Sequence, residues 1–415
     1  MKILLIHQYA GNKGDRAVAF AMCLLLKKIA PEVEITISTS SPELWKNITF
    51  FEHNKIKFIP TSWDFEHVEK NRAYWALLNK FKKYTFTIHR ECYILSGRDG
   101  LCRFLINPSF YKALKVSDLV ISVGGHHFTT LLSRDLVSTI NYDAMSVLSL
   151  GKKLSCFSQT FGPFEFYNKR NLLLTQKILS SCEALYVREK SSIKSLNQLH
   201  IPNDAIHEVQ ESVIYLNVLF NSYVLPSKRE KKIGIAIYAT QKRSHEIMEQ
   251  YIRAIAGSVK HFIQKGFQIV FFPMELKNSG PDDRPLIREI MQIVGADKES
   301  CGYIDVDMNT ELHLYEVSKC QLFIGHKTHS TIFALTSGTP LVGIAYHPKT
   351  REFMKQFDVE DYCIDDENLT AEILIRKVER LLENMDAIGE YTFQRARKCK
   401  TQLERGMSSL VNVLK

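Results

Sequence analysis

The chain has 415 residues, of which 45% are hydrophobic and 24% charged, and a formal net charge of +9 at pH 7. This length exceeds what one hydrophobic core usually supports, so we expect two domains, and the composition excludes disordered and fibrous proteins. No apolar stretch is long enough for a membrane span, and the run Lys2–Ile6 is too short for a signal peptide. Nine cysteines without a CxxC pair favour reduced thiols in the cytoplasm.

The first half of the chain reads as alternating strands and helices. Lys2–Ile6 predicts a strand, 8–15 a loop containing glycines and an aspartate, and Arg16–Ile29 a helix. Further strands are predicted at 33–38, 119–123, 153–158 and 184–187. Between about 40 and 115 the pattern is unclear, and we expect an irregular insertion or a mobile lid there.

The polar stretch 226–232 interrupts the periodicity, and it divides the chain into predicted domains at 1–226 and 227–415. After it, strands are predicted at 233–238, 268–272, 303–306, 321–324 and 341–345. Helices are predicted at 244–265, 285–294, 311–320, 330–337 and 350–357, with two more after 370. The pattern predicts an α/β protein of two doubly wound, Rossmann-like domains that face a cleft, with ligands at the carboxyl ends of the strands.

The most informative residues follow two strands of the second predicted domain. Lys327 and His329 lie between the strand at 321–324 and a helix expected from Ser330, and Lys349 follows the next strand. Parallel strands place these ends side by side, and the helix N-terminus favours an anion. One such residue alone would usually be a solvated surface group, but three together predict a cationic site with a titratable imidazole.

Several motifs, in this order, resemble those of the polysaccharide pyruvyl transferase family. They are Asn12-Lys13-Gly14-Asp15-Arg16-Ala17, Gly124-Gly125, Gln159-Thr160-Phe161-Gly162-Pro163, Arg188-Glu189-Lys190-Ser191-Ser192, Gly325-His326-Lys327-Thr328-His329-Ser330, Gly338-Thr339-Pro340 and Tyr346-His347-Pro348-Lys349. The resemblance spans most of residues 1–360, and the family's fold is similar to that of GT-B glycosyltransferases. The chain departs from the family at Lys327, where most members have arginine; lysine keeps the charge but loses the bidentate fork.

The resemblance implies a reaction. The family moves the pyruvyl group of phosphoenolpyruvate onto sugar hydroxyls of a cell-surface polysaccharide or its precursor, which forms a ketal and releases phosphate without a metal or other cofactor. The resemblance implies that His329 and Asp15 are catalytic. It implies donor-binding roles for Arg188, Lys327, Thr328, His329 and Lys349. It implies acceptor-binding roles for Asn12, Gly14, Asp15, Gly124, Gly125 and His126.

Three parts of the sequence have alternative interpretations. Asp15 orients an acceptor hydroxyl or acts as a base, or else it caps the helix expected from Arg16. His126 and His127 are adjacent, so one of them binds the acceptor or both are solvated. Asp305-Val306-Asp307 resembles a metal ligand set but fits a strand end and a helix cap better.

The segment Lys70–Phe86 mixes lysines with Trp75, Phe81, Tyr84 and Phe86. This composition suits peripheral contact with the inner face of a membrane near a lipid-linked acceptor, and it also suits an ordinary helix with snorkelling lysines. No nucleic-acid-binding module is recognisable, so no nucleic-acid partner is expected.

Two other functions compete with pyruvyl transfer. A GT-B-like glycosyltransferase with a nucleotide-sugar donor would have the same fold, but no acidic residue suited to a ribose follows the glycines of the second domain. A non-catalytic relative would not need to retain Arg188, His329 and Lys349.

Overall fold

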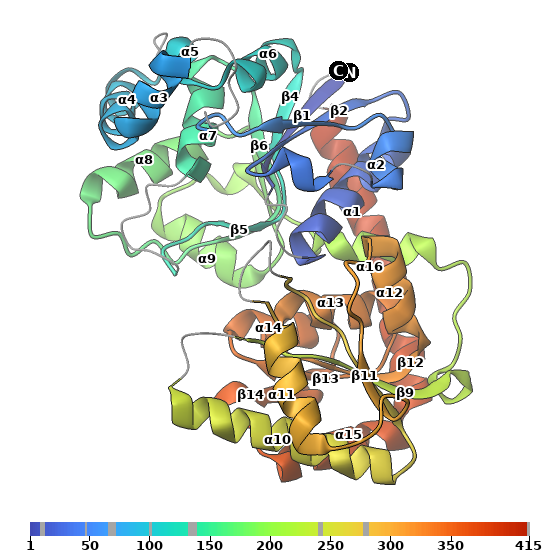
Figure 1. Ribbon diagram of the computed structural model, residues 1–415. Coiled ribbons are helices and arrows are strands. Elements are labelled where there is room, and N and C mark those ends of the chain that lie inside the picture. Colours follow the sequence, from blue (N-terminus) through green and yellow to red (C-terminus); the bar gives the residue numbers. More distant parts are fainter. Residues whose placement is uncertain are drawn as a thin grey trace. The chain divides into compact units, whose positions relative to one another are not determined.

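The computed structural model describes residues 1–8, 13–45, 48–64, 72–98, 102–131, 139–239, 244–276 and 282–412. The chain forms two compact units (Figure 1). The first unit comprises Met1–Ala10, Val18–Ser212 and Gln402–Lys415, and the second comprises Gly11–Ala17 and Val213–Thr401. Each unit is built around one parallel sheet.

The sheet of the first unit has its first strand in the middle. Its strands are β1 (Lys2–Gln8), β2 (Glu34–Thr39), β3 (Lys57–Pro60), β4 (Leu119–Ser122), β5 (Gly125–Phe128), β6 (Leu154–Phe161), β7 (Ala184–Val187) and β8 (Ile206–Glu208). They lie in the order β3-β2-β1-β4-β6-β7-β8, with β5 paired to β6, and all of these pairs are parallel. The chain therefore winds first to one edge and then to the other, and all residues of β4 and β6 are buried, as helices on both faces require.

The helices of the first unit correct one expectation. They are α1 (Lys13–Ile29), α2 (Thr49–His53), α3 (Arg72–Lys80), α4 (Lys82–Ser96), α5 (Cys102–Leu105), α6 (Pro108–Val116), α7 (Thr139–Ser149), α8 (Lys169–Ser180) and α9 (Lys190–Gln198). The described part of 40–115 therefore contains β3 and five α-helices, and the expected irregular insertion is wrong. For α2 and α4 the start signals were missing, because their N-cap residues Ile48 and Phe81 make no side-chain cap hydrogen bond.

The second unit repeats the same winding with a smaller sheet. Its strands are β9 (Glu230–Ala236), β10 (Gln268–Phe271), β11 (Cys301–Tyr303), β12 (Cys320–Gly325), β13 (Leu341–Ala345) and β14 (Cys363–Asp365), in the order β11-β10-β9-β12-β13-β14. Its helices are α10 (His245–Gln264), α11 (Arg284–Val294), α12 (Thr310–Lys319), α13 (Thr328–Ser337), α14 (Pro348–Gln356), α15 (Ala371–Glu383) and α16 (Met385–Asn412). Short 3₁₀ helices occupy Pro42–Trp45, Asn203–Ala205, Ser212–Leu219, Pro226–Lys228, Glu360–Tyr362 and Asp366–Asn368. The predicted fold class, two doubly wound α/β units, is confirmed.

The division between the units differs from the predicted boundary at 226. The chain passes from the first unit to the second after Ser212, and the residues between Ser212 and β9 pack within the second unit. The ring of Tyr223 stacks on Phe393 with centroids 4.7 Å apart, and its hydroxyl donates to the Gly338 carbonyl at 3.2 Å. The polar stretch 226–232 therefore marks the approach to a strand, and α16, which begins in the second unit, ends in the first.

Two helices of the second unit end on a left-handed glycine, which offers a matched test of packing. Gly295 follows α11 with φ of 70° and Gly338 follows α13 with φ of 64°. A Cβ at Gly295 would meet nothing within 4 Å, whereas one at Gly338 would lie 2.6 Å from Phe393 Cβ and 2.9 Å from the Gly389 carbonyl.

We expect Gly295→Ala to lower the free energy of unfolding by about 1 kcal/mol, the cost of a left-handed alanine. Gly338→Ala should lower it by about 1–3 kcal/mol more, because the added methyl group also crowds α16. Urea denaturation of both variants measures the difference. Equal losses would show that the contact with Phe393 adapts without cost.

Candidate active site

Polar side chains gather where four neighbouring strands of the second unit end. Tyr238 follows β9, Glu275 follows β10, His326 and Lys327 follow β12, and Tyr346 follows β13. The ring of Tyr238 lies 4.4 Å from that of Tyr346 and 5.7 Å from that of His326, measured between centroids. The carboxyl edge of this sheet therefore carries one continuous polar cluster, where doubly wound sheets bind their ligands.

Lys327 is held by two carboxylates at this edge. It is the N-cap residue of α13, and its Nζ lies 3.1 Å from Asp283 Oδ1 and 3.3 Å from Glu275 Oε2. Asp283 is fully buried, and it also accepts hydrogen bonds from the backbone N–H groups of Met274 and Glu275, both at 2.9 Å. The sequence predicted a donor-binding cation here, and the structure adds two internal anions that the sequence did not reveal.

The three charged groups of this cluster differ in access to solvent. The side chain of Glu275 is 20% exposed, compared with 9% for Lys327 and none for Asp283. Burial raises the pKa of Glu275, the Lys327 ammonium opposes this shift, and the Asp283 carboxylate adds to it. Glu275 is therefore the member of the cluster best placed to carry a proton to or from a ligand.

His329 lies in the first turn of α13 against the backbone of Gly14. A Cβ built on Gly14 would lie 2.2 Å from His329 Nδ1 and 2.3 Å from its Cγ, so only glycine allows the imidazole to occupy this position. Gly14 is in the first turn of α1, which groups with the second unit. Two of the sequence motifs are thus in direct contact, and the N–H groups of the α13 first turn lie beside them.

The start of α1 decides one of the open alternatives. The helix begins at Lys13, so Asp15 is inside the first turn and the interpretation as an N-cap is wrong. An acidic residue in a first turn interacts favourably with the helix dipole, and Asp15 is half-buried. Asn12, the other predicted polar acceptor ligand of this motif, lies outside the described residues.

The first turn of α1 is also fixed by Asp307. Arg16 Nη1 lies 2.7 Å from Asp307 Oδ2, and the buried Lys13 Nζ lies 3.2 Å from Oδ1. Burial lowers the pKa of Lys13; burial would raise the pKa of Asp307, but Arg16 and Lys13 hold it below its usual value.

The expected role of Asp305–Asp307 at a strand end and helix cap is therefore wrong. Asp305 lies 3.2 Å from Arg284, and β11 has already ended at Tyr303. The cap of α12 is Asn309, whose side chain accepts from the Leu312 N–H at 2.8 Å.

The predicted donor residues Thr328 and Lys349 lie in the first turns of neighbouring helices. Thr328 Oγ1 is 3.0 Å from Thr350 Oγ1, which joins the start of α13 to the start of α14. His347 caps α14, and its Nδ1 accepts from the Lys349 N–H at 3.2 Å. Burial lowers the pKa of His347 and the charge of Lys349 lowers it further, so this imidazole is neutral and can accept. The structure thus brings Lys327, Thr328, His329 and Lys349 to one edge of the second unit.

A cavity of about 440 Å³ adjoins these helix starts. It is lined by Ala345, Tyr346, His347, Pro348, Arg351, Asp365, Asp366 and Glu367. The buried His326 supports its wall, with Nε2 3.2 Å from Asp366 Oδ1 and Nδ1 3.0 Å from Tyr251 Oη. The acidic lining comes from the last residue of β14 and the two residues after it, and this three-residue strand was not predicted from the sequence.

Arg188, another predicted donor ligand, is in the first unit and belongs to a buried network. Its Nη1 donates to Glu211, its Nε lies 3.4 Å from Glu189 Oε2, and its Nε also donates to Thr160 Oγ1 at 2.9 Å. Arg188 is 5% exposed and Glu211 is fully buried. Ser192 donates to Glu189 and accepts from the Phe161 N–H at 2.8 Å, so the Arg-Glu-x-x-Ser motif links β6, β7 and α9.

The paired glycines of the first unit are required by close packing. A Cβ at Gly124 would lie 3.0 Å from the Ser158 carbonyl, and one at Gly125, whose φ is 137°, would lie 2.5 Å from His127 Nε2. His127 is buried, with Nε2 3.1 Å from the Gly124 carbonyl, whereas His126 is half-buried. Of the two adjacent histidines, His126 is therefore the more accessible.

A buried polar chain at the carboxyl ends of β1, β4 and β6 was not foreseen. Gln159 Nε2 donates to the Val123 carbonyl at 2.9 Å and to Ser122 Oγ, and Ser122 Oγ lies 2.6 Å from His7 Nδ1. A signal was present in the sequence, since His7 and Gln8 end an apolar run.

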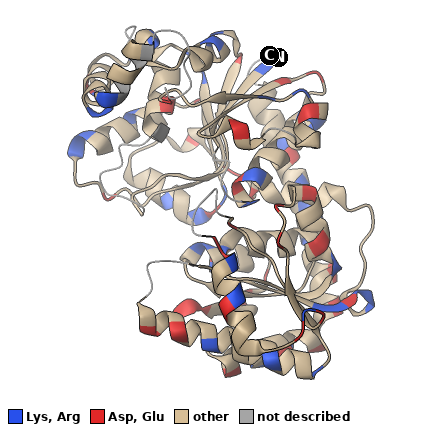
Figure 2. Cartoon of the chain, in the orientation of Figure 1, with Lys and Arg blue, Asp and Glu red and all other residues tan. Residues whose placement is uncertain are grey.

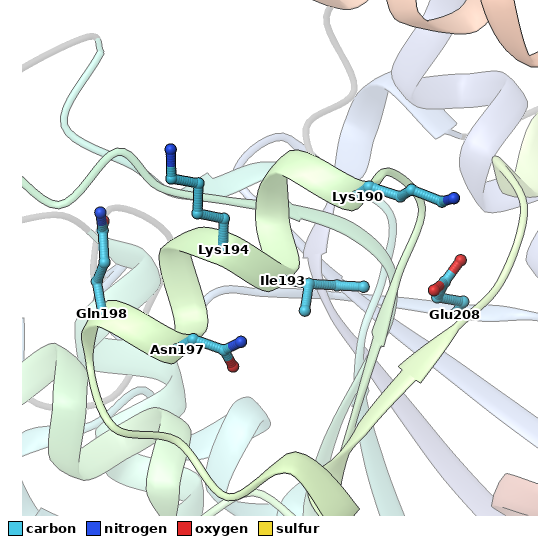
Figure 3. A pocket seen from close by; sticks show the side chains of 6 residues that line it. All are labelled: Lys190, Ile193, Lys194, Asn197, Gln198 and Glu208. Atoms are coloured by element: carbon cyan, nitrogen blue, oxygen red, sulfur yellow. The ribbon is translucent and has the colours of Figure 1, made fainter.

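The first unit also has a surface cavity of about 660 Å³ beside α9 and β8. Figure 3 shows Lys190 and Glu208 at one end of it and Asn197 and Gln198 at the other. None of the predicted site residues lines this cavity.

Within the described ranges, no three His, Cys, Asp or Glu side chains form a group that could hold a metal ion. In the same part of the chain, no helix is both long and apolar enough to cross a membrane.

The Arg188 network gives a stability prediction with a matched control. Arg188→Ala leaves the fully buried Glu211 without its main counter-charge, so the free energy of unfolding should fall by about 3–5 kcal/mol. Arg170 pairs with Glu91 at the surface, where both side chains are at least 33% exposed, and Arg170→Ala should cost less than about 1 kcal/mol. Chemical denaturation compares the two variants. An Arg188→Ala protein as stable as the unchanged chain would contradict a structural role for this ion pair.

Comparison with known proteins agrees with the geometry. The solved structure of UDP-GlcNAc 2-epimerase from Neisseria meningitidis, bound to UDP-GlcNAc, has a TM-score of 0.61 at 12% identity and covers 99% of this chain and 100% of its own. Alr3699/HepE from Anabaena, in complex with UDP and glucose, has a TM-score of 0.57 at 12% identity, with all of both chains covered. At such low identity these similarities establish the fold, which is of the GT-B type.

The sequence comparisons are more specific. Amylovoran biosynthesis protein AmsJ from Erwinia amylovora is 23% identical over 439 residues, which covers 100% of this chain and 99% of that protein. The sequence model described as polysaccharide pyruvyl transferase matches residues 12–348, which include all the motifs from Gly14 to His329. The chain therefore belongs to the polysaccharide pyruvyl transferase family.

Proposed function

We propose that this protein transfers the pyruvyl group of phosphoenolpyruvate to two hydroxyls of a sugar in a cell-surface polysaccharide or its precursor. The product is a cyclic ketal, and phosphate is released. The observation that carries the proposal is the contact between His329 and Gly14, which joins two family motifs at the start of α13. The relation to an amylovoran biosynthesis protein supports exopolysaccharide as the class of acceptor.

The donor has two anionic groups, and we assign them to the helix starts of the second unit. Lys349 and Thr328 lie in the first turns of α14 and α13, and backbone N–H groups of those turns favour anions. Lys327 reaches the same edge, and its contact with the partly exposed Glu275 is the one that a donor anion would replace. Arg188 stays a predicted donor ligand in the first unit, although two carboxylates already contact it.

The proton transfers can be assigned to three side chains. Glu275, whose pKa burial raises, gives a proton to the methylene carbon of the donor, and the resulting oxocarbenium-like carbon is attacked by one sugar hydroxyl. His329 takes the proton of that hydroxyl and passes it to the departing phosphate. The second sugar hydroxyl then attacks the same carbon, which closes the ketal and breaks the bond from that carbon to the phosphate oxygen. The proton of this second hydroxyl returns to Glu275. Asp15, beside Gly14, orients the attacking hydroxyl.

Asn12, Gly14, Asp15, Gly124, Gly125 and His126 stay predicted acceptor ligands. The closely packed Gly124 and Gly125 leave backbone groups near a ligand, and the half-buried His126 is accessible to it. The reaction as written balances without a metal or a further cofactor, and we place it in the cytoplasm, where phosphoenolpyruvate is available.

The donor assignment predicts a specific thermal shift. Phosphoenolpyruvate should raise the melting temperature by mass action, and Lys349→Ala should remove most of that increase because it deletes a cation from the donor site. Lys355→Ala is the matched control, since Lys355 is an exposed lysine in the last turn of the same helix. A protein that is stabilised by nucleotide sugars and not by phosphoenolpyruvate would be a glycosyltransferase instead.

The contact between Gly14 and His329 predicts a loss of turnover without a loss of stability. In Gly14→Ala the new methyl group occupies the position of the imidazole, so His329 must move and kcat should fall by about 100-fold or more, as for a lost acid–base group. Alanine favours the helix, which offsets part of the strain. Gly257→Ala in α10 is the control, because its Cβ would meet only Ala371, at 3.1 Å. Phosphate release from phosphoenolpyruvate with an oligosaccharide acceptor measures the effect, and an unchanged kcat would remove His329 from the mechanism.

A further inference from the structure

Helix α4 exposes apolar side chains on the face opposite the core. Phe86 and Tyr93 point inward and are each 1% exposed, as part of the core of the first unit. Tyr84, Ile88 and Leu95 are 69%, 61% and 80% exposed. Their spacing of four and seven residues places them in one stripe along the helix. The helix is therefore apolar on two faces, and only one of them is covered.

The neighbouring α3 extends this stripe. Tyr74 and Leu77 of α3 are 41% and 54% exposed and lie three residues apart on one helical face. Phe81, which directly follows α3 and is the N-cap residue of α4, is 43% exposed. The rings of Phe81 and Tyr84 have centroids 6.3 Å apart, so the two faces are continuous. We call these six residues, Tyr74, Leu77, Phe81, Tyr84, Ile88 and Leu95, the α3–α4 stripe.

The stripe is concentrated in one region of the first unit. Phe104 of α5 is 55% exposed, and its carbonyl accepts from the Tyr74 hydroxyl at 2.9 Å, which ties α5 to α3. Figure 1 shows α3, α4 and α5 grouped together. With Phe104, the stripe accounts for 7 of the 21 large hydrophobic side chains that are exposed in the described part of the chain. A patch of this density on a soluble domain indicates an interaction surface.

The same region is strongly basic. Residues 72–105 contain seven Lys or Arg and two Asp or Glu, a net charge of +5 out of +9 for the whole chain. The acidic Glu91 is already paired with Arg90 and Arg170. Lys80 and Lys83 are exposed beside the stripe, and Figure 2 shows Lys and Arg along these helices. The surface therefore combines apolar side chains with a net positive charge.

Two simpler explanations fit less well. Lysines that snorkel over apolar surface cover only part of the region: Lys82 Nζ lies 5.5 Å from the Trp63 ring, while Tyr84, Ile88 and Leu95 stay exposed. The cores of protein–protein interfaces are depleted of lysine, whereas lysine with aromatic residues is typical of membrane interfaces.

We propose that the α3–α4 stripe binds the surface of an anionic membrane. Its apolar side chains enter the boundary between headgroups and acyl chains, and Lys80 and Lys83 contact the anionic headgroups. The proposal does not depend on the donor or on the reaction. Membrane binding through the α3–α4 stripe would hold a transferase at the surface where a lipid-linked acceptor is presented.

Flotation of the full chain with lipid vesicles tests the proposal. The protein should float with phosphatidylcholine vesicles that contain about a third phosphatidylglycerol, and much less with phosphatidylcholine alone or at high salt. The triple variant Tyr84→Ser, Ile88→Ser, Leu95→Ser should lower the partition coefficient by about 10-fold or more, because three apolar side chains no longer enter the lipid. Lys80→Glu with Lys83→Glu should remove the preference for anionic lipid.

The control triple variant changes the same residue types elsewhere. Tyr315, Ile293 and Leu312 of the second unit are 54%, 45% and 43% exposed, and Tyr315→Ser, Ile293→Ser, Leu312→Ser should leave flotation unchanged. Melting temperatures of both triple variants check that the fold is intact.

Two kinds of result would overturn the proposal. The first is an unchanged chain that does not bind anionic vesicles at low salt, or a stripe variant that binds as well as the unchanged chain. The second is concentration-dependent dimerisation that the stripe variant abolishes while no vesicle binding occurs, which would assign this surface to a second copy of the chain.

Discussion

Charge buried inside a protein needs a counter-charge close by, and this requirement shapes both halves of the chain. In the first unit the guanidinium of Arg188 lies between Glu211 and Glu189, and in the second the ammonium of Lys327 lies between Asp283 and Glu275. Each cation directly follows a parallel strand or caps the next helix, so the ion pairs fix the loops at the strand ends. The positions of Thr328 and His329 depend on this anchoring, because they continue the chain from Lys327.

The family motifs differ in whether their structural contacts alone explain them. The Arg-Glu-x-x-Ser motif joins strands to a helix through Ser192 and the Phe161 N–H, and it needs no ligand to explain it. The contact of Gly14 with His329 has no comparable structural purpose, because glycine weakens the first turn of a helix. Gly14 lowers the stability of its helix and leaves space for the imidazole of His329. It therefore indicates a catalytic role more strongly than Arg188 does.

Much of the fold followed from the sequence, because strands buried on both faces read as continuous apolar runs and α10 shows a clear apolar face. The helices between 40 and 115 did not, and for two of them the reason is visible: the N-cap residues Ile48 of α2 and Phe81 of α4 make no side-chain cap hydrogen bond. The strand-end segments carrying Lys327, His329 and Lys349 were found because parallel strands must end together. Asp283 and Glu275, the partners of Lys327, lie in other loops, and periodicity within one segment carries no information about contacts between segments.

Neither unit is a continuous stretch of the chain, since Gly11–Ala17 groups with the second unit and the last turns of α16 group with the first. Exchange of units between relatives therefore requires four junctions. A chimera spliced once near Ser212 would pair the first turn of α1 from one parent with the Asp307 and His329 of the other, and the end of α16 with a foreign neighbour around Val209. A chimera that keeps both units whole takes Gly11–Ala17 and Val213–Thr401 from one parent. It takes the rest of the chain, including the segment from Gln402, from the other parent.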